Sequence, residues 1–384
     1  MHFAITLTGG IKSWLWVLAL VAFTYSQAQA QTRPKAPAVP KEATTTVEAL
    51  GQWLKSQYPD PTTRLTATYA WVTQNLAYDH EDAFTFSVEA KEQRAVAAQA
   101  MQTRKHVCRG IAALFEALCS QGGSQAYVVN GYARQGDLVG HAWVAVLTPA
   151  GWRLFDPTWE INRAENPTLA GLPWAYFLQK GEAFRPNHMP FDPLWQLSQS
   201  PLTYAAFDAA RSRPVPPPKP GNFAFADSIE AFLQLDSLAQ KEATYRRMSA
   251  QKATNYAITS YGHTLGQNIQ VVKHNRFAAV YDSSVVAANA FVARYNTYIR
   301  AYNARFKQVS DSSLLGMLSK MEADLNRSQA QLKKAFALRT NPDHLETLYQ
   351  TKTFLAESSQ KLAEVQRFLT KYLAANKVNR LFMW

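Results

Sequence analysis

The chain has 384 residues but only two cysteines, Cys108 and Cys119. If residues 108–120 form one helix, eleven residues separate the two thiols by about 16 Å along the axis. A disulfide requires Cα atoms within roughly 7 Å, so we expect two unpaired thiols. Cys119 lies among Leu114, Phe115 and Leu118 and is expected to be buried as a small apolar residue. Cys108 has no such evident structural use.

The sequence also lacks an apolar run long enough to span a membrane. Residues 13–23 are apolar, but a spanning helix needs about 20 residues. Lys12 precedes this run and Ala28-Gln29-Ala30 follows it as a small-x-small cleavage site, so residues 1–30 are predicted to be a signal peptide. We expect a mature chain that begins near Gln31, has no transmembrane span or lipid anchor, and is secreted or periplasmic.

Acidic residues are few, with 28 Asp and Glu against 40 Lys and Arg, which gives a net charge of +12. Most of the excess, +9, falls in residues 221–384. One interpretation is a solvated helical surface, and the other is attraction to anionic envelope polymers or membrane surfaces. Nucleic acid is not expected as a partner of an exported chain.

The apolar content of 47% is ordinary for a folded protein, and the length suits two domains. Residues 31–44 are predicted to be a flexible Pro-rich leader, and residues 211–220 a stiff Pro-rich linker. Between them, residues 45–210 form the first predicted domain. Residues 221–384 form the second, a helical bundle.

The first predicted domain is helical at its start and changes period further on. Apolar stripes predict helices from Val47 and from Pro61, and a further helix that contains Cys108 and ends near Gly122-Gly123. Strands are predicted around 127–129, 142–147 and 152–155, with 148–151 as the tight turn between the last two. Helices followed by antiparallel strands favour an α+β domain.

Beyond the linker, apolar residues recur every seven positions. This spacing predicts long helices that pack side by side, as an antiparallel bundle or a hairpin of coiled coils. Ser310-Asp311 and Asn341-Pro342-Asp343 are the expected ends of these helices. The repeating residues are Val292, Ile299 and Phe306; Leu318, Leu325 and Leu332; and Leu348, Leu355, Leu362 and Leu369.

Cys108 lies where the chain is predicted to enter a helix, and His141 and Asp156 follow it on later segments. A thiol, an imidazole and a carboxylate in this order suit a nucleophile, a base and a group that orients the base. Unpaired N–H groups at a helix start favour a thiolate. Nearby positive charge is expected to do the same, from Arg104, Lys105 and Arg109.

The residue numbers of the predicted hairpin show which side chains would share a face of the sheet. If Thr148 pairs with Gly151, the numbers of paired residues add to 299, which places Asp156 opposite Trp143 and diagonal to His141 on one face. Other histidines are weaker partners for the thiol; among them, His80 and His188 have no apparent strand context. We expect the backbone N–H of Cys108 to contribute to an oxyanion hole, together with a second donor that the sequence does not identify.

Residues 47–200 resemble the transglutaminase-like superfamily of papain-like cysteine enzymes, and within it bacterial proteins similar to the kyphoscoliosis peptidase. The resemblance implies a papain-like α+β core with Cys108 as nucleophile, His141 as base and Asp156 as orienting residue. The matching segments are Tyr69–Asp79, Val107–Ala112, Gly140–Trp143, Trp152–Trp159 and Phe191–Leu197.

Two departures from the family pattern bear on function. Ile111 stands where an aromatic residue often follows Cys-x-Gly. The Gly-Gln-Cys-Trp pattern and the acidic clusters of the calcium-dependent cross-linking enzymes are also missing.

The predicted function is an exported cysteine-dependent hydrolase of peptide or isopeptide bonds, acting through a thioester. Its substrates are expected to be proteins or peptides, with cell-envelope peptides as one class, and the C-terminal helices are a surface for a protein partner. Three alternatives remain: an amine-accepting acyl transferase with the same triad, a binding or scaffold protein that acts through its basic helices, and a metal site of Cys108, His141 and Asp156. We expect no cofactor and no metal.

Overall fold

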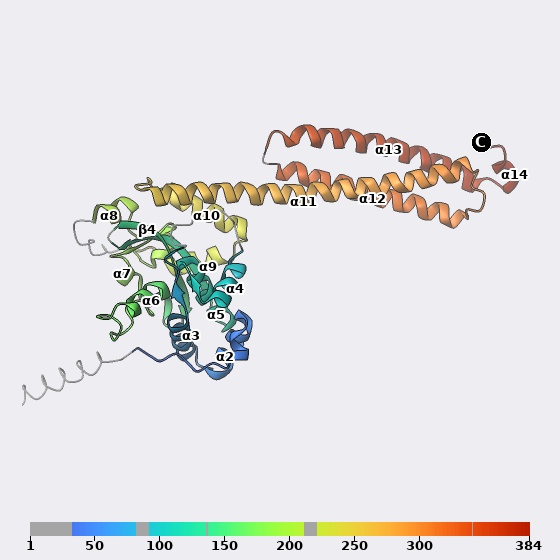
Figure 1. The fold of residues 1–384 in the computed structure, drawn as a ribbon. Coiled ribbons are helices and arrows are strands. Elements are labelled where there is room, and N and C mark those ends of the chain that lie inside the picture. The colour runs from blue at the N-terminus through green and yellow to red at the C-terminus, as the bar shows by residue number, and fades with distance from the viewer. Residues whose placement is uncertain (1–32, 82–91, 136, 211–220, 340) are drawn as a thin grey trace, which may run out of the picture. The chain divides into compact units, whose positions relative to one another are not determined.

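The computed structural model describes residues 33–81, 92–135, 137–210, 221–339 and 341–384. By internal contacts the chain divides into two compact units, one ending at His263 and one comprising Thr264–Trp384 (Figure 1). The predicted signal peptide and the Pro-rich linker at 211–220 lie outside the described residues. Among the helices that are described, none is both long and apolar enough to cross a membrane.

The first unit opens with helices at the predicted positions, α2 (Val47–Gln57) and α3 (Pro61–Asn75). Each begins at a side chain that accepts a backbone N–H of the first turn, from Thr46 for α2 and from Asp60 for α3. Such caps satisfy donors that have no partner within the helix. The apolar stripes of both helices then enter the core of the unit.

Part of the predicted flexible leader is attached to this unit. The side chain of Gln74 donates to the carbonyl of Pro34 at 2.8 Å and accepts the N–H of Ala36 at 2.9 Å. Arg33 lies 2.9 Å from the buried carboxylate of Glu160. These contacts hold an extended segment that ends in the short helix η1 (Lys41–Thr44).

The helix that contains Cys108 forms the centre of the first unit. α4 (Gln93–Thr103) ends at Arg104, which adopts a left-handed φ of 56°. The chain then runs through β2 (Lys105–His106), which pairs in parallel with β1 (Ala77–Tyr78), and enters α5 (Cys108–Gln121). The buried part of α5 is formed by residues 110–115, 118 and 119. The predicted helix over 108–120 is thus confirmed, and both cysteines are unpaired.

A four-stranded antiparallel sheet packs against α5. Its strand order is β5-β4-β3-β6, formed by β3 (Ala126–Gln135), β4 (Asp137–Thr148), β5 (Gly151–Phe155) and β6 (His188–Pro190). β4 and β5 pair from Thr148 with Gly151 to Val144 with Phe155. The predicted register is therefore confirmed, and a one-residue slip, which would turn every side chain to the other face, is excluded.

Aromatic packing requires a glycine in the middle of the sheet. Gly131 of β3 pairs with His141 on one side and with Pro190 on the other. A Cβ at Gly131 would overlap the indole of Trp143 and the backbone carbonyl of Met189. Glycine at position 131 therefore leaves room for the indole of Trp143 next to the residue that pairs with His141.

Short helices complete this region: α6 (Pro157–Glu165), α7 (Gly181–Phe184), η3 (Pro193–Gln196) and α8 (Tyr204–Ala209).

Helices α9 (Phe225–Leu233) and α10 (Ser237–Ser249) belong to the first unit, although the sequence placed them in the helical domain. They share a hydrophobic core with the sheet face that is opposite α5. The boundary between units therefore falls after His263, later than expected, because the apolar faces of α9 and α10 cover the tryptophans of the sheet. The residues of this core include Trp143, Trp152, Trp195, Ile229, Phe232 and Ala243.

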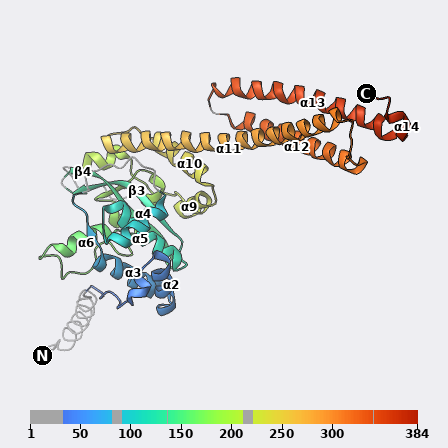
Figure 2. The same ribbon diagram turned by 45° about the vertical axis from the view of Figure 1, so that its right-hand side comes forward.

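The second unit consists of long helices, as its heptads predict. α11 (Tyr256–Asn303) begins in the first unit and supplies one helix, and α12 (Asp311–Leu338) and α13 (His344–Ala374) supply the others, lying side by side in both views (Figures 1 and 2). Ser310 caps α12 as expected. A short α14 (Lys377–Arg380) follows. The buried repeating residues include Leu325, Leu332, Leu348, Leu355, Leu362 and Leu369.

The basic excess of the chain belongs to this second unit. Residues 264–384 contain 17 Lys and Arg against eight Asp and Glu, whereas residues 221–263 contain four of each. The positive charge therefore lies on the helical unit and not on α9 and α10.

Candidate active site

Cys108 is the first residue of α5 and is partly exposed, while Cys119 of the same helix is buried. Burial raises the pKa of the Cys119 thiol well above its ordinary value, so that thiol stays protonated and unreactive. The residue before Cys108, Val107, has no side chain that could cap the helix. The first-turn N–H groups of α5 therefore receive no side-chain cap from the preceding residue.

Two of the three basic residues expected to favour the thiolate are engaged elsewhere. Arg104 lies 4.5 Å above the ring of Trp71 and donates to the carbonyl of Thr44 at 3.0 Å. Lys105 pairs with Asp79 at 3.1 Å. Both basic groups therefore have other partners, and their effect on the Cys108 thiolate stays a prediction.

The structure brings His141 and Asp156 into contact. Nε2 of His141 lies 2.7 Å from Oδ2 of Asp156, and both side chains are almost completely buried. His141 is on β4 and Asp156 is the residue after β5, so the hairpin register alone places them on one face. This is the diagonal pairing that the sequence predicts.

Asp156 is held from several sides. Its Oδ1 accepts the N–H of Trp159 at 3.0 Å and so caps α6. Its backbone carbonyl accepts the hydroxyl of Tyr69 at 2.9 Å, which reaches across from α3. Tyr69 belongs to a segment of the family resemblance, but its contact with Asp156 could not be predicted from the spacing of residues. These bonds fix both the carboxylate and the backbone beneath it.

The ionic state of the pair follows from these contacts. Burial alone lowers the pKa of His141, but the charge and hydrogen bond of Asp156, with a further contribution from Cys108, raise it to about 10. Burial would raise the pKa of Asp156, yet the charge of His141 and the hydrogen bonds from His141 and His188 hold it well below its usual range. The pair therefore exists as imidazolium and carboxylate at neutral pH.

Cys108 is the other partner of His141, through a hydrogen bond and through its charge. Since Nε2 of His141 already bonds to Asp156, Nδ1 is the ring nitrogen left to face the sulfur. Trp159 lies beside this ring, with centroids 5.6 Å apart. The thiol of Cys108 is therefore partly exposed, whereas the imidazolium of His141 and the carboxylate of Asp156 behind it are buried.

His188 is a member of this site that the sequence missed. The statement that it has no strand context is wrong, because it begins β6, whose three residues pair with β3. Its Nε2 lies 2.9 Å from the same Asp156 oxygen that His141 contacts. The other histidine left open, His80, is exposed and lies 3.8 Å from Glu165.

A metal is the alternative for a site with two histidines and a carboxylate. The ligand atoms of His141, Asp156 and His188 lie within 4.8 Å of one another. This set differs from the one that the sequence suggested, because His188 takes the place of Cys108. Both Nε2 atoms point at one carboxylate oxygen at hydrogen-bond distance, so the three side chains satisfy one another without an ion between them.

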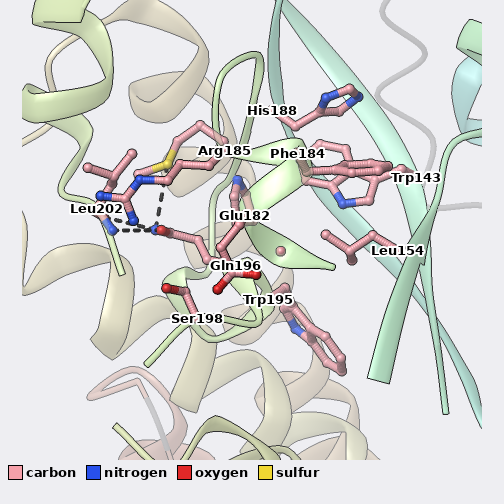
Figure 3. A pocket seen from close by; sticks show the side chains of 13 residues that line it. Trp143, Leu154, Glu182, Phe184, Arg185, His188, Trp195, Gln196, Ser198 and Leu202 are labelled. Carbon is pink, nitrogen blue, oxygen red and sulfur yellow. Dashed lines mark hydrogen bonds between the residues drawn. The ribbon is translucent and has the colours of Figure 1, made fainter. Parts of the chain in front are cut away.

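Hollows elsewhere in the first unit do not include Cys108. A cavity of about 10 Å³, the space of a single water, lies beside His188 among Trp143, Leu154 and Arg185 (Figure 3). A larger hollow of about 630 Å³ is lined by residues of β5 and the segment 197–200. Neither is the place where a substrate would meet the thiol.

A helix-start thiol beside a buried histidine–carboxylate pair is the arrangement that papain-like cysteine enzymes have in common. The family model of the transglutaminase-like superfamily matches residues 48–157 of this chain, which include all three side chains. The chain therefore carries a transglutaminase-like domain, followed by a long helical region.

Known proteins similar to this chain include the kyphoscoliosis peptidases of Mus musculus and Homo sapiens, which are 30% and 29% identical to it over 157 residues. The matches cover 38% of this chain and 23% of each peptidase, so the chain spans less than a quarter of these relatives. Solved structures are more distant. A protein of Cytophaga hutchinsonii assigned to the cysteine proteases has 18% identity and a TM-score of 0.24 over 33% of this chain and 46% of its own. A transglutaminase has 20% identity and a TM-score of 0.23, and the match covers 37% of this chain and 38% of the transglutaminase.

Gly110 is required by the ring that packs on the first turn of α5. An added Cβ would overlap the imidazole of His106 at its ring atoms, so this ring would have to shift. We expect Gly110→Ala to lower the free energy of unfolding by about 1–3 kcal/mol and to slow alkylation of Cys108 several-fold. Tryptophan fluorescence during urea unfolding measures the first effect, since every tryptophan after residue 30 except Trp384 lies in the first unit.

Gly316→Ala is the matched control for this substitution. Gly316 is also helical, in α12, and a Cβ there would meet nothing within 4 Å. Alanine should stabilise that helix by up to about 1 kcal/mol. If Gly110→Ala is equally stabilising and leaves Cys108 alkylation unchanged, the packing of His106 does not set the position of the thiol.

Proposed function

We propose that this protein is an exported cysteine-dependent hydrolase of peptide or isopeptide bonds. The observation that carries the proposal is the line of contacts from Cys108 through His141 to Asp156, with the last contact at 2.7 Å. Similarity of residues 48–157 to the transglutaminase-like superfamily supports it. Export rests on the signal-like segment that opens the sequence.

The reaction follows from the positions of these groups. The Cys108 thiolate attacks the carbonyl carbon of the substrate, and a C–S bond forms while the carbonyl oxygen takes the negative charge. The imidazolium of His141 then gives its Nδ1 proton to the leaving amine as the C–N bond breaks, which leaves a thioester. Neutral His141 next removes a proton from water, hydroxide attacks the thioester, and the thiolate and a carboxylic acid are released.

Two donors on this chain would stabilise the oxyanion. One is the backbone N–H of Cys108, at the start of a helix without a side-chain cap. The second that we propose is the hydroxyl of Tyr78, a residue that pairs in β1 with His106, two positions before Cys108. Burial first, and then the charge of Cys108, raise the pKa of Tyr78 to about 12, so its hydroxyl remains a donor at neutral pH.

A library of synthetic peptides and lysine isopeptides in water enriched in ¹⁸O tests this function. Wild-type protein is expected to release new carboxylates that each carry one ¹⁸O atom, and Cys108→Ala should release none. Mass spectrometry reads both outcomes. Addition of a primary amine separates hydrolysis from transfer, because new amides in place of labelled carboxylates would identify an acyl transferase. Equal product from Cys108→Ala would refute any thiol mechanism.

A further inference from the structure

The carboxylate of Asp156 has more hydrogen-bond partners than a Cys-His-Asp triad requires. Its Oδ1 accepts one backbone N–H, and its Oδ2 faces two imidazoles, from His141 at 2.7 Å and from His188 at 2.9 Å. An ionised carboxylate only accepts hydrogen bonds. Both Nε2 atoms therefore carry a proton, and His188 is present as the Nε2–H form.

The two histidines differ in charge despite sharing one oxygen. Burial lowers the pKa of His188 to about 4, against the opposing effect of Asp156, so the ring is neutral where His141 is charged. Aromatic rings enclose it: the centroid of Phe184 lies 4.4 Å away and that of Trp143 lies 5.0 Å away (Figure 3), and the centroid of Trp159 also lies 4.4 Å away. Such a cage offers no solvent to stabilise a second cation.

A chain of polar groups fixes the neutral form of His188. Its Nδ1 lies 2.7 Å from Oδ1 of Asn187, and Nδ2 of Asn187 donates to the hydroxyl of Tyr176 at 3.3 Å. The oxygen and nitrogen of an amide have the same shape, so their assignment follows from the network. The neutral Nε2–H form leaves Nδ1 without a proton, so it requires the Asn187 amide to be turned over from this orientation, with its N–H donating to Nδ1 and its oxygen accepting the Tyr176 hydroxyl. Every group in this chain is then satisfied.

The other polar groups near His188 come from neighbouring elements. Asp156 and His141 are the charges that act on its ring. Glu182 and Arg185 of the α7 region line the same small cavity. Burial raises the pKa of Tyr176, so that its hydroxyl also remains protonated.

We propose that His188 is a positioning residue, whose neutral Nε2–H fixes Oδ2 of Asp156 so that the carboxylate holds His141 toward Cys108. This inference rests on the proposed function, because it assigns His188 a part in activating that thiol. A neutral donor is the suitable choice here, since a second cation would compete with His141 for the carboxylate. If His188 were only a structural residue of the core, its substitution would change the stability of the fold and not the reactivity of Cys108.

Two substitutions separate the proposal from a structural role. His188→Gln keeps an amide N–H at the position of Nε2, and His188→Phe keeps a ring among aromatic neighbours but donates nothing. The readout is the rate at which iodoacetamide alkylates Cys108 between pH 4 and pH 9, measured on the full chain by mass spectrometry of the peptide that contains it. No substrate is needed.

We expect wild-type protein and His188→Gln to react rapidly down to acidic pH with similar profiles. His188→Phe should shift the acid limb upward by about one pH unit, because Asp156 loses a hydrogen bond to its charged form, and lower the plateau several-fold. Wild-type-like profiles for both variants, or an equal loss at every pH for both, would overturn the proposal. If wild-type protein itself reacts only above about pH 8, as a free thiol does, the proposed function fails first.

A measurement on the wild-type protein guards against a variant that does not fold. Nitrogen NMR of ¹⁵N-histidine protein at pH 7 should show one buried neutral ring protonated at Nε2 and bare at Nδ1, which disappears in His188→Gln. A His188 ring protonated at both nitrogens, or at Nδ1 alone, would overturn the proposal without any appeal to activity.

Discussion

Cys108→Ala protein is expected to fold like the wild type and to lose at least about 10⁴-fold of its hydrolytic rate, since the proposed acyl intermediate forms on the sulfur of this residue. The side chain of Cys108 is only partly buried, so its removal leaves little cavity. Initial rates on any peptide that the wild type cleaves, together with a thermal melt, measure both effects.

Cys119→Ala is the matched control for this loss. Cys119 lies on the same helix but is buried, and its thiol is protonated. We expect this variant to lose about 1–2 kcal/mol of stability through the small cavity and to keep its hydrolytic rate. If Cys119→Ala abolishes hydrolysis while Cys108→Ala preserves it, the nucleophile has been assigned to the wrong residue.

Asp156→Asn should lower the rate by about 10⁴-fold and the free energy of unfolding by about 3–5 kcal/mol at pH 6. Asp156 accepts hydrogen bonds from His141, from His188 and from the N–H of Trp159. An amide has one oxygen and one NH₂ group, so at least one of these donors would face another donor in a fully buried place. His141 would also lose the charge that keeps it protonated.

The stability lost in Asp156→Asn should depend on pH. The pKa of His141 rises to about 10 in the folded protein, from about 6.5 in an unfolded chain. Its stabilising contribution is therefore complete below pH 6.5 and is lost as the pH rises to about 10. The difference in unfolding free energy between wild type and Asp156→Asn should narrow over that interval. A constant difference would mean that His141 is not held as an imidazolium.

The hairpin that carries His141 could be predicted because the residues that determine it are close in sequence. Four residues, Thr148 to Gly151, set the turn, and the register of β4 and β5 then places Asp156 beside His141. The helical unit was predictable for the same reason, since each heptad reports the packing of its own helix. In both cases the residues that determine the geometry lie close to one another in the sequence.

His188 could not be found in this way. It lies 32 residues beyond Asp156, on a strand of only three residues. A strand so short has no alternation of apolar and polar residues to reveal it. The signal that the sequence does offer is weak: a histidine among aromatic residues just before Phe191-Asp192-Pro193, a segment of the family resemblance.

The boundary between the two units, after His263, could not be predicted for a different reason. An amphipathic helix shows that it has a buried face but not what covers that face. Phe232 of α9 contacts Tyr127 and Trp195 of the first unit, with ring centroids 5.7 Å and 5.9 Å away. Arg247 of α10 forms two hydrogen bonds to Asp192, at 2.7 Å and 2.6 Å. Neither contact could be inferred from the spacing of apolar residues.

The pH dependence of Cys108 alkylation by iodoacetamide, compared between the wild type and His141→Ala, tests the central claim most directly. If Cys108, His141 and Asp156 act as one unit, the wild type reacts rapidly at pH 5–6, and His141→Ala reacts appreciably only when the pH approaches about 8.5. Identical profiles for the two proteins, both rising near pH 8.5, would contradict the assignment of this site.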